Sequence, residues 1–346
     1  MSLTTVPRPT RSASPRTARR LIALAGAVLL LIVVSTVSLA VGSAMLPLDV
    51  VWDAFFAPDG SPAQVTVTEA RVQRTILGVL VGAALGVAGG LIQALTRNPL
   101  ADPGILGVNA GAGFAIVLGV ALFGVTRIDQ YLPFAFIGAI AATALVYLIA
   151  SGGRGAPTPV RLTLVGIAFG AVLMGVTQTL TLIDPETFDR MRFWGAGTIA
   201  DRPEGTVATI VPFIVGGLIV AAIAARPLNA LALGDELARS VGVKIGLTRL
   251  LVVVAVTLLC GAATAAAGPI SFVGLMIPHA VRWVTGPDWR WILAFSVVLA
   301  PALVLVSDII GRLVVFPAEL QVGVVTAFVG APVLIALVRR SRARAL

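Results

Sequence analysis

The chain has 346 residues, of which 58% are hydrophobic and only 12% charged, and its formal net charge is +9. This apolar content is enough for roughly ten membrane-spanning helices of about 20 residues each, which predicts a multi-pass membrane protein. Cys260 is the only cysteine and His279 the only histidine, so an intrachain disulfide, a Cys/His metal site and a pair of haem ligands are excluded.

The predicted elements begin with an arginine-rich tail over residues 1–20. The first apolar run, 21–42, is too long and too far from the N-terminus for a simple signal peptide, so we expect a retained span. The runs together predict a ten-helix domain over 21–338, followed by a basic tail over 339–346. They lie near residues 21–42, 75–95, 105–124, 132–150, 162–183, 207–225, 250–267, 270–284, 292–310 and 322–338.

Charge placement gives an orientation to these spans. With the N-terminal tail in the cytoplasm and the sides alternating, most of the 25 basic residues fall in cytoplasmic segments. Of the 16 acidic residues, only four fall there: Asp102, Asp235, Glu236 and Asp288. This positive-inside distribution predicts a ten-span chain with both termini in the cytoplasm. The net positive charge thus reflects topology and argues against nucleic-acid binding.

A polar, charged segment at 228–245 interrupts the apolar pattern. It predicts two short helices separated by Gly234, with Asp235 and Glu236 in the first turn of the second helix, where acidic residues suit the helix dipole. Gly242 can end that helix. Short amphipathic helices between spans offer a surface to a partner protein.

No energy source is apparent within the chain. Its only lysine, Lys244, lies between Val243 and Ile245 and belongs to no G-x-x-x-x-G-K-[ST] loop. The middle parts of the predicted spans hold almost no ionisable residues, whereas ion-coupled transporters and proton pumps place such residues there. Uphill transport would therefore draw on another chain, and a separate ATPase that docks on the 228–245 segment fits both observations.

Four segments occur in a fixed order: GGLIQALTRNPLADPGILG (89–107), the polar segment 228–245, GPISFVGLMIPHAVR (268–282) and SDIIGRLVVFPAELQVGVVTAFVGAP (307–332). Together they resemble the FecCD family of ABC-importer permeases, the membrane subunits for ferric siderophores, haem and cobalamin. The resemblance implies an all-α membrane protein with the type II ABC-importer permease fold and ten transmembrane helices. It also implies a transport subunit that is not an enzyme and has no catalytic residues, cofactor or metal.

The resemblance further implies partner chains. Two ATP-binding subunits would dock from the cytoplasm, and an extracytoplasmic substrate-binding protein would deliver a ferric siderophore, the commonest cargo class in the family. A second permease subunit, either another copy or a paralogue, would complete the path.

Three external arginines match family positions that face the binding protein and pair with its glutamates. Arg71 and Arg74 match an R-x-P-R motif in which Gln73 replaces the usual proline, and Arg312 follows the ninth span. The alternative interpretation is that these arginines only anchor the ends of spans.

Further positions match the family at the cytoplasmic face. The turn after the second span holds Asn98, Pro99 and Pro103, for which a structural role is favoured. The turn RGAPTPVR (154–161) aligns with the family's cytoplasmic gate, and Thr158 is its best candidate residue. The residues that match the ATPase-coupling helices are Leu231, Gly234, Asp235, Glu236, Ala238, Arg239 and Gly242.

Other functions fit the sequence less well. A cobalamin or haem importer permease is the nearest alternative. A secondary transporter would need the ionisable residues that the mid-membrane positions lack. An integral membrane enzyme, such as a prenyl or lipid transferase, would need clustered acidic residues, and the chain has no D-D-x-x-D motif.

Overall fold

The computed structural model describes residues 15–42, 45–125, 128–152, 158–185, 191, 194–316 and 318–343. Within these ranges the chain forms helices and connecting turns and no β-strand, which confirms the predicted all-α class. Three predicted features lie wholly or partly outside the described residues: the N-terminal tail before residue 15, the first part of the 154–161 turn, and residues 344–346 of the basic tail.

Each predicted apolar run coincides with one helix. Seven helical segments in the described residues are long and apolar enough to cross a membrane, whereas α5 and the apolar part of α14 are shorter and α12 has only 13 residues. The count of ten spans therefore stays a prediction. The helices are α1 (Pro15–Ala40), α4 (Val72–Thr96), α5 (Val108–Phe123), α6 (Ile128–Ser151), α7 (Pro159–Ile183), α9 (Thr206–Leu231), α11 (Ile245–Ala267), α12 (Val273–Thr285), α13 (Trp289–Val314) and α14 (Val322–Ala343).

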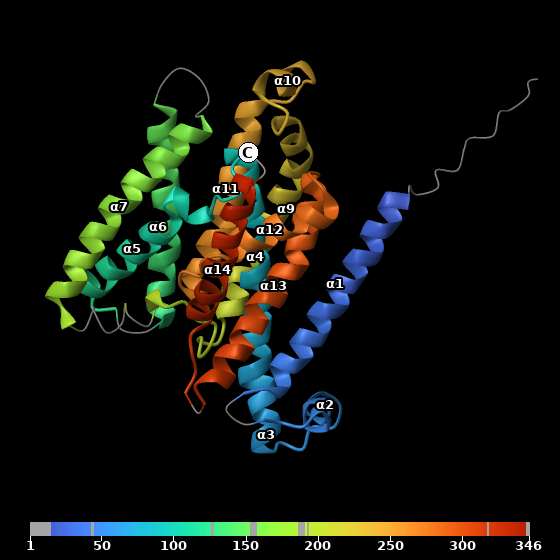
Figure 1. Cartoon of the computed structure of the whole chain (residues 1–346). Coiled ribbons are helices and arrows are strands. Elements are labelled where there is room, and N and C mark those ends of the chain that lie inside the picture. Colours follow the sequence, from blue (N-terminus) through green and yellow to red (C-terminus); the bar gives the residue numbers. More distant parts are fainter. Residues whose placement is uncertain are drawn as a thin grey trace, which may run out of the picture.

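Short helices mark the two ends of the bundle. At one end lies α10 (Asp235–Ser240), and at the opposite end lie α2 (Leu48–Phe56) and α3 (Pro62–Val65), while α1 and α7 form opposite flanks (Figure 1). A π-helical segment, η1 (Thr66–Arg71), connects α3 directly to α4. A short 3₁₀ helix, η2 (Pro103–Leu106), follows the turn after α4.

The core is built around α4, whose second half is almost entirely buried. Close packing there depends on small residues, because apolar side chains gain little from leaving lipid and helices associate through close backbone contact. A Cβ atom on Gly89 would lie only 1.9 Å from the carbonyl oxygen of Gly274 in α12. Glycine at position 89 therefore allows α4 and α12 to touch backbone to backbone.

The 228–245 segment differs from its prediction in one respect. Its first part is the last turn of α9 rather than a separate short helix, because α9 continues through Pro227 to Leu231. This continuation buries Leu228 and Leu231, each 1% exposed. The burial of these two leucines therefore favours a helix that continues beyond Pro227, although a proline often ends a helix.

Candidate functional site

The polar segment forms a hairpin at the end of the bundle that carries α10 (Figure 1). After Leu231, a tight turn leads to Gly234, whose φ of 116° is a backbone conformation that other residues rarely adopt. Helix α10 follows, and Gly242, with a φ of 81°, then turns the chain toward α11. Two glycines thus set the path of the chain on either side of α10.

Asp235 ties this hairpin to the bundle. Its carboxylate forms an ion pair with Arg97 at the end of α4, and a second with Arg249 of α11 at 2.7 Å. Nε of Arg97 also donates to the carbonyl of Leu231 at 3.1 Å. Burial of Asp235 disfavours its charged form, but the hydrogen bond from Arg97 and the positive charges of Arg249 and Arg97 outweigh burial and lower the pKa of Asp235.

The inner side of α10 is small and apolar. Ala238 is fully buried and forms a cluster with Leu231 and Ile245. Glu236 and Arg239, by contrast, are exposed. The predicted coupling residues therefore divide into a group that fixes the hairpin and a group that faces outward.

Sequence reasoning missed three large apolar side chains on the outer side of the hairpin. Leu233, Leu237 and Val241 are 70%, 57% and 66% exposed. Leu237 and Val241 share one side of α10, because they are one helical turn apart and the N–H of Val241 donates to the carbonyl of Leu237 at 3.3 Å. Leu233 lies in the turn just before Gly234, at the start of the same helix. We call these three residues the α10 stripe. Exposed apolar side chains gathered in a polar loop are typical of a protein–protein contact.

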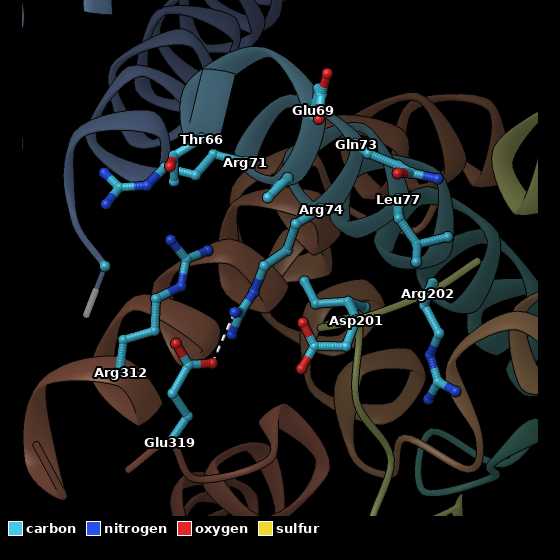
Figure 2. A pocket seen from close by; sticks show the side chains of 13 residues that line it. Thr66, Glu69, Arg71, Gln73, Arg74, Leu77, Asp201, Arg202, Arg312 and Glu319 are labelled. Carbon is cyan, nitrogen blue, oxygen red and sulfur yellow. Dashed lines mark hydrogen bonds and ion pairs between the residues drawn. The ribbon is translucent and has the colours of Figure 1, made fainter. Parts of the chain in front are cut away.

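The three predicted docking arginines come together at the opposite end of the bundle. They line a pocket of about 370 Å³, whose walls come from η1, α4, the segment around residue 200, and the end of α13 (Figure 2). The pocket carries charges of both signs, from Arg71, Arg74, Arg202, Arg312, Glu69, Asp201 and Glu319.

Arg74 lies at the centre of an ion-pair network. Its Nη2 is 2.7 Å from Oδ1 of Asp308, and its Nη1 is 2.7 Å from Oε2 of Glu319, the pair marked by a dashed line in Figure 2. Asp308 also forms an ion pair with Arg312 one helical turn away. Asp308 and Arg312 are 1% and 2% exposed, whereas Arg74 and Glu319 keep 14% and 31% of their side chains in contact with solvent.

Arg71 and Arg312 also cap the end of α1. Nη1 of Arg71 donates to the carbonyls of Leu39 and Ala40 at 2.8 and 2.7 Å. Nη1 of Arg312 donates to those of Ser38 and Val41 at 2.9 and 2.6 Å. The last carbonyls of a helix have no partner within it and carry a partial negative charge, so two guanidinium groups suit this position. Both arginines are therefore buried in contacts within the chain.

The remaining predicted residues lie in turns at the α10 end. The side chain of Asn98 accepts a hydrogen bond from the backbone N–H of Leu100 at 3.0 Å, Pro99 is exposed, and buried Pro103 begins η2. Thr158 is exposed and caps the N-terminus of α7, where its hydroxyl accepts from the N–H of Arg161 at 3.3 Å. These contacts fit structural turns and a helix cap.

In the ranges that the structure describes, no group of three or more His, Cys, Asp or Glu side chains is arranged to hold a metal ion. Asp235, Arg74 and Asp308 form ion pairs at the two ends, and Arg71 and Arg312 cap α1. The geometry favours docking at the two ends of a membrane bundle.

Comparisons with known proteins agree with this arrangement. Residues 30–340 match the FecCD transport family. The ferric enterobactin transport system permease protein FepD of Escherichia coli (strain K12) is 49% identical over 322 residues, which cover 93% of this chain and 96% of that protein. The cobalamin import system permease protein BtuC of Halobacterium salinarum is 37% identical, over 82% of this chain and 76% of that protein.

A solved structure supports the fold. A metal-chelate type ABC transporter in an inward-facing conformation superposes with a TM-score of 0.81 at 26% identity, covering 92% of this chain and 99% of the other. The likeness extends over nearly the whole bundle rather than to a single helical hairpin.

Proposed function

Because the chain belongs to the FecCD transport family, we propose that it carries a ferric siderophore across the cell membrane. The chain is a membrane-spanning permease of an ABC importer, and an importer of this class works with ATPase and substrate-binding partners. It is a transport subunit and not an enzyme. The siderophore assignment is supported by a relative of 49% identity that transports ferric enterobactin.

The α10 stripe carries the proposed ATPase contact. Its three side chains are more than half exposed at the end of the bundle, and the chain itself has no P-loop. We assign the apolar contact to this stripe and the polar rim to Glu236 and Arg239. Leu231, Gly234, Asp235, Ala238 and Gly242 would hold the stripe in position. Two ATP-binding subunits would dock in this way, one on each of two permease subunits.

This assignment sets the orientation of the chain. The α10 end would face the cytoplasm and the α2–α3 end the outside, in line with the positive-inside distribution of arginines. Both termini would then be cytoplasmic in the bacterial cell membrane. An accessibility assay tests this with single cysteines in the Cys260→Ala background, one at Ser240 and one at Asp59. A membrane-impermeant maleimide should label Asp59→Cys from outside and should spare Ser240→Cys.

The binding protein is proposed to dock at the pocket around Arg74. Arg74 is partly exposed and bound to the more exposed Glu319, so a carboxylate on the binding protein is expected to replace Glu319 on its outer side. Arg71 and Arg312 are buried, and they would support docking by holding α1 and Asp308 in place. Complementary charges of this kind mainly raise the association rate and fix the register.

The proposed path runs along α14. An open cavity of about 740 Å³ is lined by uncharged residues of α14 and neighbouring loops, and Phe328 is 83% exposed at its wall. A second permease subunit facing this surface would enclose a path with neutral walls. Thr158, at the start of α7, stays the gate candidate, and Asn98, Pro99 and Pro103 stay the fixed turn after α4.

Uptake in a deletion strain tests the substrate. Cells that lack this permease should lose uptake of radio-iron given as a ferric siderophore, and the wild-type chain should restore it. Haem and labelled cobalamin, the alternative cargoes, should enter at equal rates with and without the chain. Restored uptake of cobalamin or haem, with no effect on the ferric siderophore, would replace the proposed substrate with that compound.

A further inference from the structure

An apolar groove with two arginines at its mouth lies outside both docking surfaces. It has a volume of about 370 Å³ and runs between α9 and α13, with Val87 of α4 at its floor. The two walls supply mostly small or aliphatic side chains and one arginine each: Leu218, Ala221, Ala222, Ala225 and Arg226 from α9, and Arg290, Leu293, Ala294 and Val297 from α13.

The two arginines are available for a ligand. Arg226 and Arg290 are exposed, and within the described part of the chain no hydrogen bond or ion pair involves either guanidinium group. Asp288 is the acidic residue nearest to Arg290 in the sequence, and it does not pair with the guanidinium group. Its carboxylate accepts from Nδ2 of Asn229 at 2.8 Å and from the backbone N–H of Arg290 at 3.0 Å. Arg249, at the same end of the bundle, is by contrast held by Asp235.

We expect the groove to lie where one leaflet of the bilayer meets water. Trp283 is 63% exposed, Trp291 is next to Arg290 in the chain, and tryptophans of this kind gather at the membrane interface. From Arg226 to Leu218 the groove extends about 12 Å along α9, at a rise of 1.5 Å per residue. Its charged mouth is therefore at headgroup level, and its apolar part points into the hydrocarbon.

We propose that this groove binds an anionic phospholipid of the leaflet at the α10 end. The phosphate lies between Arg226 and Arg290, and the first half of one acyl chain lies over Ala222 and Ala294. A soluble acidic segment would leave the apolar walls unused, and free phosphate would contact only the mouth. Charge and shape together therefore select a lipid. Because α9 leads directly into α10, the bound lipid links α13 to the helix that carries the α10 stripe.

Lipid retention by the purified full-length chain tests the proposal. The protein is placed in micelles with equal amounts of phosphatidylglycerol and phosphatidylethanolamine, and bound lipid is counted by native mass spectrometry. Wild-type protein should retain phosphatidylglycerol preferentially. Each arginine near a membrane surface contributes about fivefold to the binding of an anionic lipid, so Arg226→Gln with Arg290→Gln should lower the preference roughly 25-fold.

Three further proteins make the result specific. Arg226→Lys with Arg290→Lys should keep most of the preference for phosphatidylglycerol, because both positive charges remain. Ala222→Phe with Ala294→Phe should lose the lipid although both arginines are present, because the phenyl rings fill the groove. Arg239→Gln removes an exposed charge at the same end and should match wild type. All substitutions lie on exposed or half-exposed positions, and monodisperse elution establishes that each protein is folded.

The proposal is overturned by any of three results. In the first, Arg226→Gln with Arg290→Gln retains phosphatidylglycerol as well as wild type does. In the second, Ala222→Phe with Ala294→Phe retains it as well as wild type does. In the third, inorganic phosphate at the concentration of the lipid displaces it completely, which would mean that the site takes a phosphate group and not a lipid.

Discussion

The charge of Asp308 is predicted to be essential to the folded structure at the α2–α3 end. The change Asp308→Asn keeps the shape of the side chain and removes its charge. Asp308 is 1% exposed and binds two arginines: Arg74 through Nε and Nη2 at 2.7–3.2 Å, and Arg312 through Nε at 3.0 Å and through Nη2. The substitution therefore leaves the buried positive charges of Arg74 and Arg312 with Glu319 as the only ion-pair partner among the described residues.

The cost follows from that burial. Removing one partner of a buried ion pair costs about 3–5 kcal/mol, because the remaining charge is left in a poorly solvated position. The loss also extends to α1, since Arg312 donates to the carbonyls of Ser38 and Val41 and its position depends on Asp308. We expect Asp308→Asn to lower the free energy of unfolding by an amount in this range.

The measurement is reversible unfolding in mixed micelles with increasing dodecyl sulfate. Glu69→Gln is the matched control: it removes an acid that lines the same pocket but is exposed and forms no ion pair within the described residues. It should change stability by less than about 0.5 kcal/mol. Combining Asp308→Asn with Arg312→Met should recover part of the lost stability, because the buried positive charge of Arg312 is removed together with its partner. Equal effects of the Asp308 and Glu69 substitutions would show that the buried charge of Asp308 adds no stability.

Three further predictions concern the α10 hairpin and the core. Leu237→Asp should weaken co-purification of the ATPase at least about tenfold, because the contact would lose a buried leucine. The control Leu237→Met should preserve co-purification. Wild-type retention of the ATPase by the Leu237→Asp variant would show that the α10 stripe is not in the interface. Because ion pairs lower the pKa of Asp235, the stability that it adds is complete above its ordinary value of 3.8 and is lost as pH falls through the lower folded value. Hydrogen exchange in α10 should show this acid step in wild type and not in Asp235→Asn, and an identical step in both would assign it to another group. Gly89→Ala should destabilise the bundle by roughly 1–3 kcal/mol or more, because its Cβ would meet a backbone oxygen at 1.9 Å. The control Gly216→Ala, whose Cβ would have no neighbour within 4 Å, should be neutral or slightly stabilising. Equal stability of the two variants would contradict the packing described for α4.

The positions of the helices were predictable because apolar runs of about 20 residues have a direct physical meaning in a membrane. Each run coincides with one helix. The end of α9 was not predictable from local rules. Pro227 signals a boundary, whereas the helix continues because Leu228 and Leu231 are buried against other helices. Such burial depends on residues far away in the sequence.

The candidate sites were predictable in position but not in the roles of individual residues. Arg71, Arg74 and Arg312 do gather in one pocket, yet only the structure separates partly exposed Arg74 from the two arginines that cap α1. No sequence pattern links Arg312 to carbonyls more than 270 residues earlier. In the α10 stripe, the four-residue spacing of Leu237 and Val241 is visible in the sequence, whereas the exposure of all three side chains is visible only in the structure.

We infer that an ATPase partner, and not an ion gradient, drives siderophore transport through this chain. The most direct measurement is uptake of a radio-iron siderophore into proteoliposomes that hold the permease, with its ATPase subunits included or omitted and binding protein supplied. We expect uptake only when the ATPase subunits and ATP are both present, whatever proton or sodium gradient is applied. Sustained uptake into vesicles that hold the permease alone, driven by either gradient, would contradict it.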